Sequence, residues 1–334
     1  MTLRGWNSFQ YDSQGWSLTN FSRTAGAGQS GYASLRATAG QVATASYGVP
    51  SSTTHIIVGF CWQHETAPND ARFFELHVSG FTALRLYRGT GGSIYAQRNG
   101  STTIGTSTPG WLFANVETYV EVRVKMSTTV GEVEVRLNGN PTPVLNLTNV
   151  NTGSASLDNI LLMGEPTGAR DFSAWYFIEV DATAPNDFLG HVRYGVLTMT
   201  GNGASSDMVG SDSNSTDNYL LVDDPAISHD SDTTYVQSPT VGDKDTYTVS
   251  DLPTTALSII GVGTVVIARK TDAGSRAIKS VVRSGGVDYQ GTDEHFLSTS
   301  YAAYRSMFLQ DPNGPATWDE TSVNAIEAGA EVTT

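Results

Sequence analysis

Short runs in which apolar and polar residues alternate make up much of the chain from residue 56 onward. Alternation with a period of two is typical of a β-strand, because successive side chains point to opposite faces of a sheet. The pattern predicts strands at residues 56–62, 72–78, 83–89, 93–99, 119–126, 132–139, 143–149, 159–165 and 172–180. GYASLRA and QVATASYGV, before residue 56, are expected to add two more.

Turn sequences such as GTGG and NGNP separate these runs, and no helical stretch lies between them. Closely spaced strands without intervening helices favour an antiparallel sandwich or barrel. The second part of the chain is also mainly strand-like, at residues 188–200, 247–271, 277–286 and 302–312. One short helix is expected from Trp318 to Ala328, with a capping box between Thr317 and Glu320 and a stop at Gly329.

Charge divides the chain in two. Residues 1–184 hold 11 basic and 13 acidic side chains, a net charge of −2, whereas residues 185–334 hold 8 and 20, a net charge of −12. DATAPND at 181–187 is the expected linker, so the predicted domains are residues 1–182 and residues 188–334. An acidic surface repels phosphate backbones, which argues against direct nucleic-acid binding.

Composition indicates the compartment in which the protein is expected to be made. The chain has one cysteine, Cys61, which excludes an internal disulfide framework. Its first residues lack the basic start and apolar run of a secretory signal, and no stretch approaches the length of a membrane helix. We therefore expect a protein made in a reducing cytoplasm, stabilised by packing and not inserted in a membrane.

Glutamates two residues apart in YVEVRVKM (119–126) and GEVEVRLNG (131–139) suggest either a catalytic pair or the polar side of a hairpin. If the two stretches form a hairpin, one register places every charge opposite its counter-charge and valine opposite valine or leucine. The charged pairs in that register are Lys125 with Glu132, Arg123 with Glu134 and Glu121 with Arg136. Shifting the register by two sets Arg123 against Arg136, or Glu121 against Glu134. The hairpin explanation is therefore preferred, with these charges on the solvent side.

The first domain resembles the concanavalin A-like lectin/glucanase jelly roll, especially its laminin-G-like members. The resemblance rests on YVEVRVKM followed by EVEVRLNG, then NILLMG and the closing AWYFIEV, over about residues 1–182. Laminarinase-type members carry Glu-x-Asp-x-Glu or Glu-x-Asp-x-x-Glu. Glu179 and Asp181 match the first two acids, but the third falls on Thr183 or Ala184. A retaining glycosidase needs two flanking carboxyls, so no enzymatic activity is expected.

Sugar binding is the other activity that this resemblance implies. Trp111, at a turn, and Tyr176 are the candidates to stack on a sugar, whereas Trp62 and Trp175 lie within strand patterns and are expected in the core. No cofactor is expected. Cys61 and His64 form a lone C-x-x-H, interpreted as a structural thiol and a solvent-side histidine. SDSNSTD (211–217) is interpreted as a solvated acidic loop, with a calcium site as the alternative.

The second domain is similar to the C-terminal region of virion structural proteins from tailed bacteriophages. The ordered segments that carry this resemblance are DFLGHVR (187–193), DTTYVQS (232–238), GDKDTYTV (242–249), TVVIARK (264–270), AIKSVVRSGG (277–286) and TWDETSVNAIEAGAEV (317–332). The resemblance implies a virion component made in the bacterial host cytoplasm: a tail, baseplate or fibre protein, or a capsid decoration. Its partners would be other virion proteins, copies of itself in a homo-oligomer such as a trimer, and a host surface glycan.

The sequence therefore supports two functional hypotheses. The leading one is a non-enzymatic virion component whose jelly roll serves as an assembly or glycan-adhesion surface. The alternative is a carbohydrate-binding or glucanase-like protein. An extracellular laminin-G module from an animal is disfavoured by the missing signal and disulfides.

Overall fold

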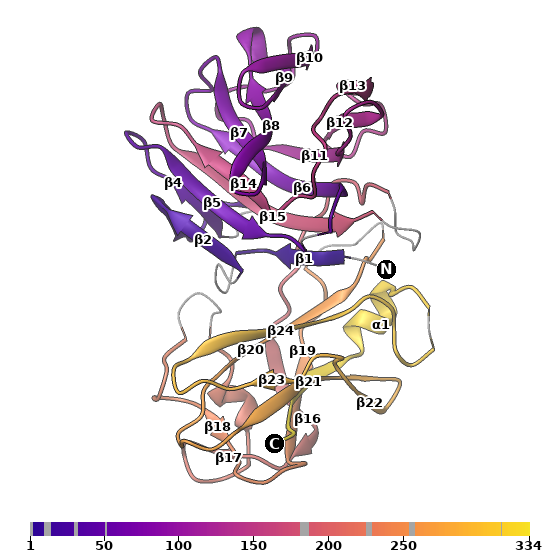
Figure 1. Ribbon diagram of the computed structural model, residues 1–334. Helices are drawn as coiled ribbons and strands as arrows, with labels where there is room; N and C mark the ends of the chain where they lie inside the picture. The colour runs from indigo at the N-terminus through magenta and orange to yellow at the C-terminus, as the bar shows by residue number, and fades with distance from the viewer. Residues whose placement is uncertain are drawn as a thin grey trace. The chain divides into compact units, whose positions relative to one another are not determined.

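The computed structural model describes residues 3–9, 15–29, 33–50, 52–180, 187–224, 229–253, 258–314 and 316–334. The chain forms two compact units, Met1–Tyr194 and Gly195–Thr334 (Figure 1). Both are built from antiparallel strands, and α1 (Glu320–Asn324) is the only α-helix in the described part of the chain. No helix among the described residues is both long and apolar enough to cross a membrane.

The first unit is a jelly-roll sandwich of two antiparallel sheets (Figure 1). The β6 sheet has the order β13-β12-β11-β6-β15-β4-β3, with β1 paired to β15. Its strands are β1 (Leu3–Asn7), β3 (Phe21–Thr24), β4 (Ser34–Ala37), β6 (His55–His64), β11 (Thr118–Lys125), β12 (Gly131–Leu137), β13 (Leu145–Val150) and β15 (Arg170–Glu179).

The β7 sheet is the other layer, with the order β10-β9-β8-β7-β14-β5-β2. Its strands are β2 (Trp16–Thr19), β5 (Ala43–Gly48), β7 (Ala71–Val78), β8 (Phe81–Arg88), β9 (Ile94–Arg98), β10 (Thr102–Thr106) and β14 (Asn159–Gly164). The 3₁₀ turn η2 (Thr90–Gly92) joins β8 to β9. The inner faces of the two sheets supply one apolar core that includes Phe60, Phe74 and Leu162, all fully buried. Trp62 and Trp175 are in this core, as the sequence predicts.

The β11–β12 hairpin has the predicted register. Lys125 faces Glu132, Arg123 faces Glu134 and Glu121 faces Arg136. On the other side of the same strands, the valines and Leu137 are buried in the core. The alternation of the two stretches therefore specifies both the pairing and the inward face.

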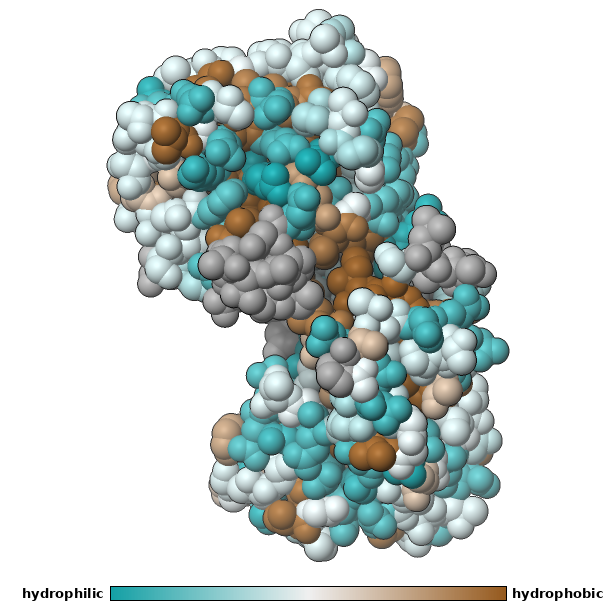
Figure 2. Space-filling view, turned by 90° about the vertical axis from the view of Figure 1, so that its right-hand side faces the viewer, coloured by the Kyte–Doolittle hydropathy of each residue, from teal (hydrophilic) through white to brown (hydrophobic). Residues whose placement is uncertain are grey.

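The second unit contains a sheet with the order β16-β19-β25-β21-β22, with β23 paired to β21, and two separate strand pairs, β17–β18 and β20–β24. Its strands are β16 (Met199–Ser206), β17 (Val209–Gly210), β18 (Val236–Gln237), β19 (Lys244–Val249), β20 (Val262–Ala268), β21 (Ala277–Ser284), β22 (Val287–Gln290), β23 (His295–Phe296), β24 (Ala302–Phe308) and β25 (Glu327–Val332). The 3₁₀ turn η3 spans Asn218–Leu221. A small core forms around Val282, Phe308 and Trp318. The face of this unit seen in Figure 2 is mostly hydrophilic, as its acidic composition predicts.

Two local expectations in this part of the chain are wrong. The helix is shorter than predicted and is capped by Asp319, whose side chain accepts from the Ser322 N–H while the Ser322 hydroxyl accepts from the Asp319 N–H. Glu327 and Ala328, predicted to end the helix, and Gly329, predicted as its stop, belong instead to β25, which pairs with β19 and β21. Residues 188–198, predicted as the start of a strand, are irregular, and β16 begins at Met199.

The first unit also extends further than the predicted boundary at residue 182. Residues 187–194, which we call the cover segment, belong to it. Phe188, Leu189, Val192 and Tyr194 pack on a small apolar cluster on the outer face of the β6 sheet. Part of the predicted linker, residues 181–186, lies outside the described residues.

Candidate functional site

The outer face of the β7 sheet carries a polar network centred on Glu75. Strand β7 alternates, so that Phe74 and Leu76 point into the core while Glu75 and His77 point outward. Arg85 of β8 lies directly opposite Glu75 in the register. A sequence that alternates in both strands therefore brings opposite charges together on the outside of the sandwich.

Two arginines and a histidine converge on the Glu75 carboxylate. Oε1 accepts from Arg72 Nη1 and Arg85 Nε at 2.6 Å each, and Oε2 lies 3.0 Å from His77 Nε2. Burial alone would raise the pKa of Glu75, but the contacts with His77, Arg72 and Arg85 outweigh it and hold the pKa below its ordinary value. Arg72 Nε also donates to Glu165 Oε1 at 2.7 Å. Glu75 is thus a buried anchor that fixes the direction of two arginines.

A pair of tyrosines lies beside this network. Tyr87 and Tyr95 are opposite each other in β8 and β9, with ring centroids 4.8 Å apart and planes inclined by 2°. The Tyr95 hydroxyl donates to Asp70 Oδ1 at 2.9 Å. Burial and this carboxylate raise the pKa of Tyr95, so the phenol stays protonated at neutral pH. Both rings are partly exposed, and together they form a rigid aromatic ledge.

The loop that follows β10 places Trp111 at the same end of the sheet as the tyrosine pair. Its backbone N–H donates to the Gly92 carbonyl at 3.1 Å, and its indole Nε1 donates to Thr108 Oγ1 at 3.2 Å. The carbonyl of the next residue, Leu112, accepts from Arg88 Nε at 3.1 Å. Leu112 is fully buried, whereas the Trp111 side chain is 39% exposed. The indole is therefore an exposed group on a firmly anchored loop, as the sequence predicts for a surface residue.

This arrangement has the elements of a carbohydrate site. Aromatic faces pack against the apolar faces of sugar rings, and a few fixed polar groups bind hydroxyls and set specificity. Sequence reasoning selected Trp111 but missed the Tyr87–Tyr95 ledge and the Glu75 network. The sequence pattern could have indicated them, because the alternation in ALRLYRG and SIYAQRN places Arg85, Tyr87 and Tyr95 on the face opposite the apolar residues.

Tyr176, the second predicted sugar-stacking residue, is not on the surface. It is 1% exposed, and its hydroxyl donates to Glu121 Oε1 at 2.5 Å. The Leu189 N–H donates to the same tyrosine oxygen at 3.2 Å. The cover segment lies over this ring, so Tyr176 has no face free for a ligand. The prediction for Tyr176 is wrong because a strand pattern does not reveal what covers its outer face.

The cover segment also changes the contacts that the charged residues of the hairpin make. Glu121 is 1% exposed and accepts from the Gly190 N–H at 2.9 Å, so it is not on the solvent side as predicted. Its counterpart Arg136 instead donates to Glu134 Oε1 at 2.7 Å. The Arg123 and Arg136 guanidinium carbons lie 4.5 Å and 4.1 Å from the centre of the Phe188 ring, a double cation–π contact.

The other two hairpin pairs make the expected ion pairs. Arg123 Nη1 lies 3.3 Å from Glu134 Oε2, and Lys125 Nζ lies 3.5 Å from Glu132 Oε1. Arg123 Nη2 also lies 2.6 Å from Asp187 Oδ1, in the cover segment. These groups make contacts within the protein, and the cover segment lies over this part of the β6 sheet. On the outer face of the β7 sheet, Tyr87 and Tyr95 are partly exposed.

The other candidate residues that the structure describes make contacts within their own unit. Cys61 is buried against the outer-face cluster, while His64 is fully buried and faces the core side with Trp62, so the histidine is not on the solvent side. Asp212 accepts from both nitrogens of Asn214 within its own turn. No group of three or more His, Cys, Asp or Glu side chains that could hold a metal occurs in the described ranges. Glu179 accepts from the Thr53 hydroxyl at 3.0 Å, and Asp181 lies outside the described residues.

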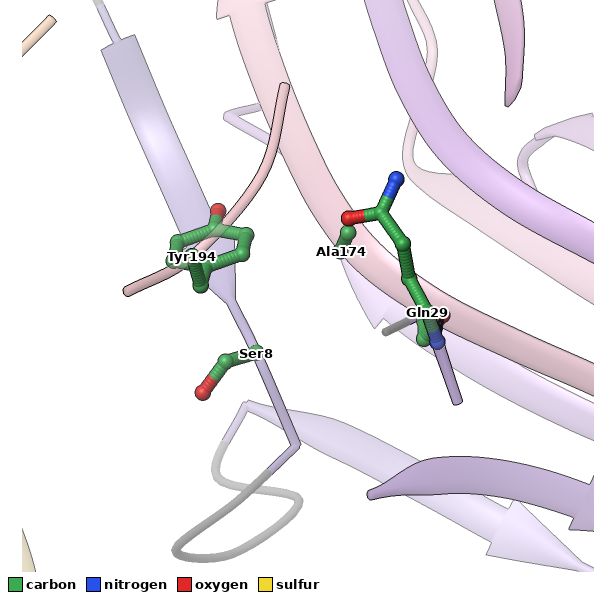
Figure 3. A pocket seen from close by; sticks show the side chains of 5 residues that line it. Ser8, Gln29, Ala174 and Tyr194 are labelled. Carbon is green, nitrogen blue, oxygen red and sulfur yellow. Dashed lines mark hydrogen bonds between the residues drawn. The ribbon is translucent and has the colours of Figure 1, made fainter. Parts of the chain in front are cut away.

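A small pocket lies between β15 and the cover segment, lined by Ser8, Gln29, Ser173, Ala174 and Tyr194 (Figure 3). Its volume is about 10 Å³, which is room for the centre of one water molecule. A pocket of this size does not admit a sugar. The open face of the β7 sheet is therefore the better candidate for ligand binding.

Comparisons with known proteins give structural matches alone. No family model matches the sequence, and no curated protein matches it. The cellulose-induced protein Cip1 matches with a TM-score of 0.41 and 12% identity, covering 53% of this chain and 97% of the other. The VIP36 exoplasmic/lumenal domain in its Ca²⁺/Man3GlcNAc-bound form matches with a TM-score of 0.39 and 12% identity, covering 56% and 96%.

The CBM2 module of the evolved Dit of Lactobacillus casei BL23 phage J-1 matches with a TM-score of 0.38 and 16% identity, covering 55% of this chain and 98% of the other. All three matches have low sequence identity. Each is matched over nearly its whole length by slightly more than half of this chain.

Proposed function

We propose that this chain is a non-enzymatic adhesion protein that binds a glycan on the outer face of its β7 sheet. The observation that carries the proposal is the combination of two parallel, partly exposed tyrosine rings with arginines that a buried carboxylate holds in place. Trp111 adds a third exposed aromatic group at the same end of the sheet.

The network favours a neutral, hydroxyl-rich ligand. Glu75 and Glu165 balance the charges of Arg72 and Arg85, so the face has no strong net field for a phosphate or polyanion. Each guanidinium has five N–H donors, and the ion pairs use some of them. The remaining donors are held in fixed directions, which lowers the entropy lost on binding.

The setting we propose is the outside of a bacteriophage particle. The ordered segments of the second unit and its acidic composition support it. Several copies in a homo-oligomer, such as a trimer, would turn weak binding of single sugars into firm attachment to a host surface glycan. Antibody labelling of purified particles in the electron microscope tests this setting, with regularly spaced label expected. Particles that carry no label would contradict it.

Glycan binding is tested by titrating the full chain with bacterial cell-wall polysaccharides and oligosaccharides on an array. Trp111→Ala and Tyr95→Ala are each expected to weaken binding about tenfold, about 1.4 kcal/mol, because each removes a stacking surface. Phe81→Ala is the matched control: Phe81 is 78% exposed on the same sheet, at the start of β8, and its loss should leave binding unchanged.

Two results would count against the proposal. Binding that survives both aromatic substitutions would place the ligand elsewhere. Release of reducing sugar from a bound polysaccharide, measured over hours, would favour the glucanase-like alternative instead.

A further inference from the structure

A second polar cluster lies inside the sandwich, away from the glycan face. Arg170 of β15 and His64 of β6 are direct partners in the register of the β6 sheet, and both are fully buried. Arg170 Nη1 donates to the carbonyls of Arg72 and Met163, at 2.9 Å and 3.2 Å, both of which belong to the β7 sheet. The guanidinium therefore reaches from one sheet to the other through the core.

Three N–H donors in this cluster have no acceptor among the described residues: Arg170 Nε, Arg170 Nη2 and His64 Nε2. The protonation of His64 follows from its contacts. Its Nδ1 accepts from the backbone N–H groups of Thr66 and Ala67, at 3.0 Å and 2.9 Å, so the ring hydrogen lies on Nε2. Burial, with Arg170 and Arg88 nearby, lowers the pKa of His64 to about 3 and keeps the ring neutral.

Positive charge is in excess here. Burial lowers the pKa of Arg170 to about 10, which still leaves it a cation at neutral pH. Glu165, the nearby acid, bonds to Arg72 rather than to Arg170. Arg88 donates to Asn69 and to backbone carbonyls, which are neutral partners. A buried cation without a bonded carboxylate is costly unless another anion compensates it.

We propose that Arg170 and His64 bind one small inorganic anion of the size of chloride between the two sheets. An anion accepts from several donors at once, whereas a water molecule accepts two hydrogen bonds and must then place its own hydrogens. The unpartnered side-chain atoms of Arg170 and His64 are all donors, which favours the anion. The ion completes the core by neutralising the guanidinium that links the sheets.

Two loops close this end of the sandwich. Glu65 N–H donates to the Ala169 carbonyl and Thr66 Oγ1 donates to the Thr167 carbonyl, each at 3.0 Å. Gly168 has a φ of +85°, and a Cβ there would lie 2.6 Å from Thr66 Oγ1 and 3.0 Å from His64 Cε1. Because the loops pack this tightly over the histidine, we expect the anion to be taken up during folding rather than exchanged freely.

The test is a crystal structure of the full chain refolded from denaturant in sodium bromide, with data collected at the bromine edge. An anomalous peak within contact distance of Arg170 Nη2 and His64 Nε2 is the expected result. No peak there, with side chains or ordered water alone beside these donors, would overturn the proposal.

Calorimetry gives an independent readout. At constant ionic strength, replacing gluconate by chloride is expected to raise the Tm of the first unit by several degrees, because an ion that binds the folded state alone stabilises it. Arg170→Met should lose this chloride dependence, and Arg276→Met, which removes a partly exposed arginine of the second unit, should keep it. A wild-type Tm that is the same in both salts would contradict the proposal. If Arg170→Met does not fold, the bromide structure of the wild type decides.

Discussion

At the scale of single residues, three glutamates with the same place in the sequence pattern have different environments. Glu132 is partly exposed, Glu134 lies between two arginines, and Glu121 is buried beneath the cover segment. Alternation predicts which face of a strand a side chain is on. It does not predict burial on the outer face, because the residues that bury Glu121 come from a distant part of the chain.

Glu121→Gln tests the burial of this carboxyl. Burial raises the pKa of Glu121 above its ordinary value of 4.5, although Tyr176 and the Gly190 N–H oppose the rise. Between the two pKa values the folded state therefore binds more proton than the unfolded state, and stability falls as pH rises from about 4.5 through the higher folded pKa. Glutamine removes this titration and keeps an acceptor oxygen for Tyr176 and Gly190.

The measurement is Tm from pH 4.5 to pH 8 for both proteins. The Tm of Glu121→Gln minus that of the wild type is expected to increase with pH over this range. A difference that stays constant or decreases would show that burial does not raise the pKa of this carboxyl.

At the scale of elements, the β11–β12 hairpin was predictable because two independent patterns agree. The valines require one face to be buried, and the charges allow one register on the other face. The tyrosine ledge could have been predicted in the same way, from alternation in β8 and β9. The sequence does not predict which strand lies next to each hairpin, because this depends on the topology of the whole sandwich.

The hairpin makes a quantitative prediction for Arg123 and Glu134. A double-mutant cycle with Arg123→Ala and Glu134→Ala is expected to give a coupling of about 0.5–1 kcal/mol in the free energy of unfolding, because the pair is directly opposite and partly buried. Lys125 and Glu132, which are more exposed, should couple more weakly and serve as the comparison. A larger coupling for the exposed pair would contradict this account.

The C-terminal helix is shorter than the sequence predicts because the residues after it form strand β25. Gly329 was interpreted as a helix stop, but in β25 it allows close approach to β19: a Cβ there would collide with the Asp245 carbonyl. The sequence alone does not distinguish a glycine that ends a helix from one that lets two strands approach closely. Pairing with β19 and β21 overrides the helical propensity of the segment, and local sequence does not report that pairing.

At the scale of the whole molecule, the first unit is longer than composition suggests. The change in charge near residue 184 suggested the boundary, yet the cover segment that follows it packs on the β6 sheet. Composition marks where surface character changes. It does not detect a short apolar segment that completes the preceding core.

Truncation tests this boundary. A chain cut after Tyr194 should unfold cooperatively, whereas a chain cut after residue 182 should melt roughly 5–10 °C lower, because Tyr119 and Tyr176 lose the apolar side chains that cover them. Calorimetry of the two chains gives the comparison. Equal Tm values would mean that the cover segment contributes little to the unit.

The outer face of the β7 sheet, and not that of the covered β6 sheet, is proposed to bind a glycan. Hydrogen–deuterium exchange of the full chain, with and without a saturating oligosaccharide identified on the array, tests it most directly. Slower exchange is expected in β7, β8, β9 and residues 107–113, with β11 and β12 unchanged. Protection confined to β11, β12 and the cover segment, or to the second unit, would contradict it.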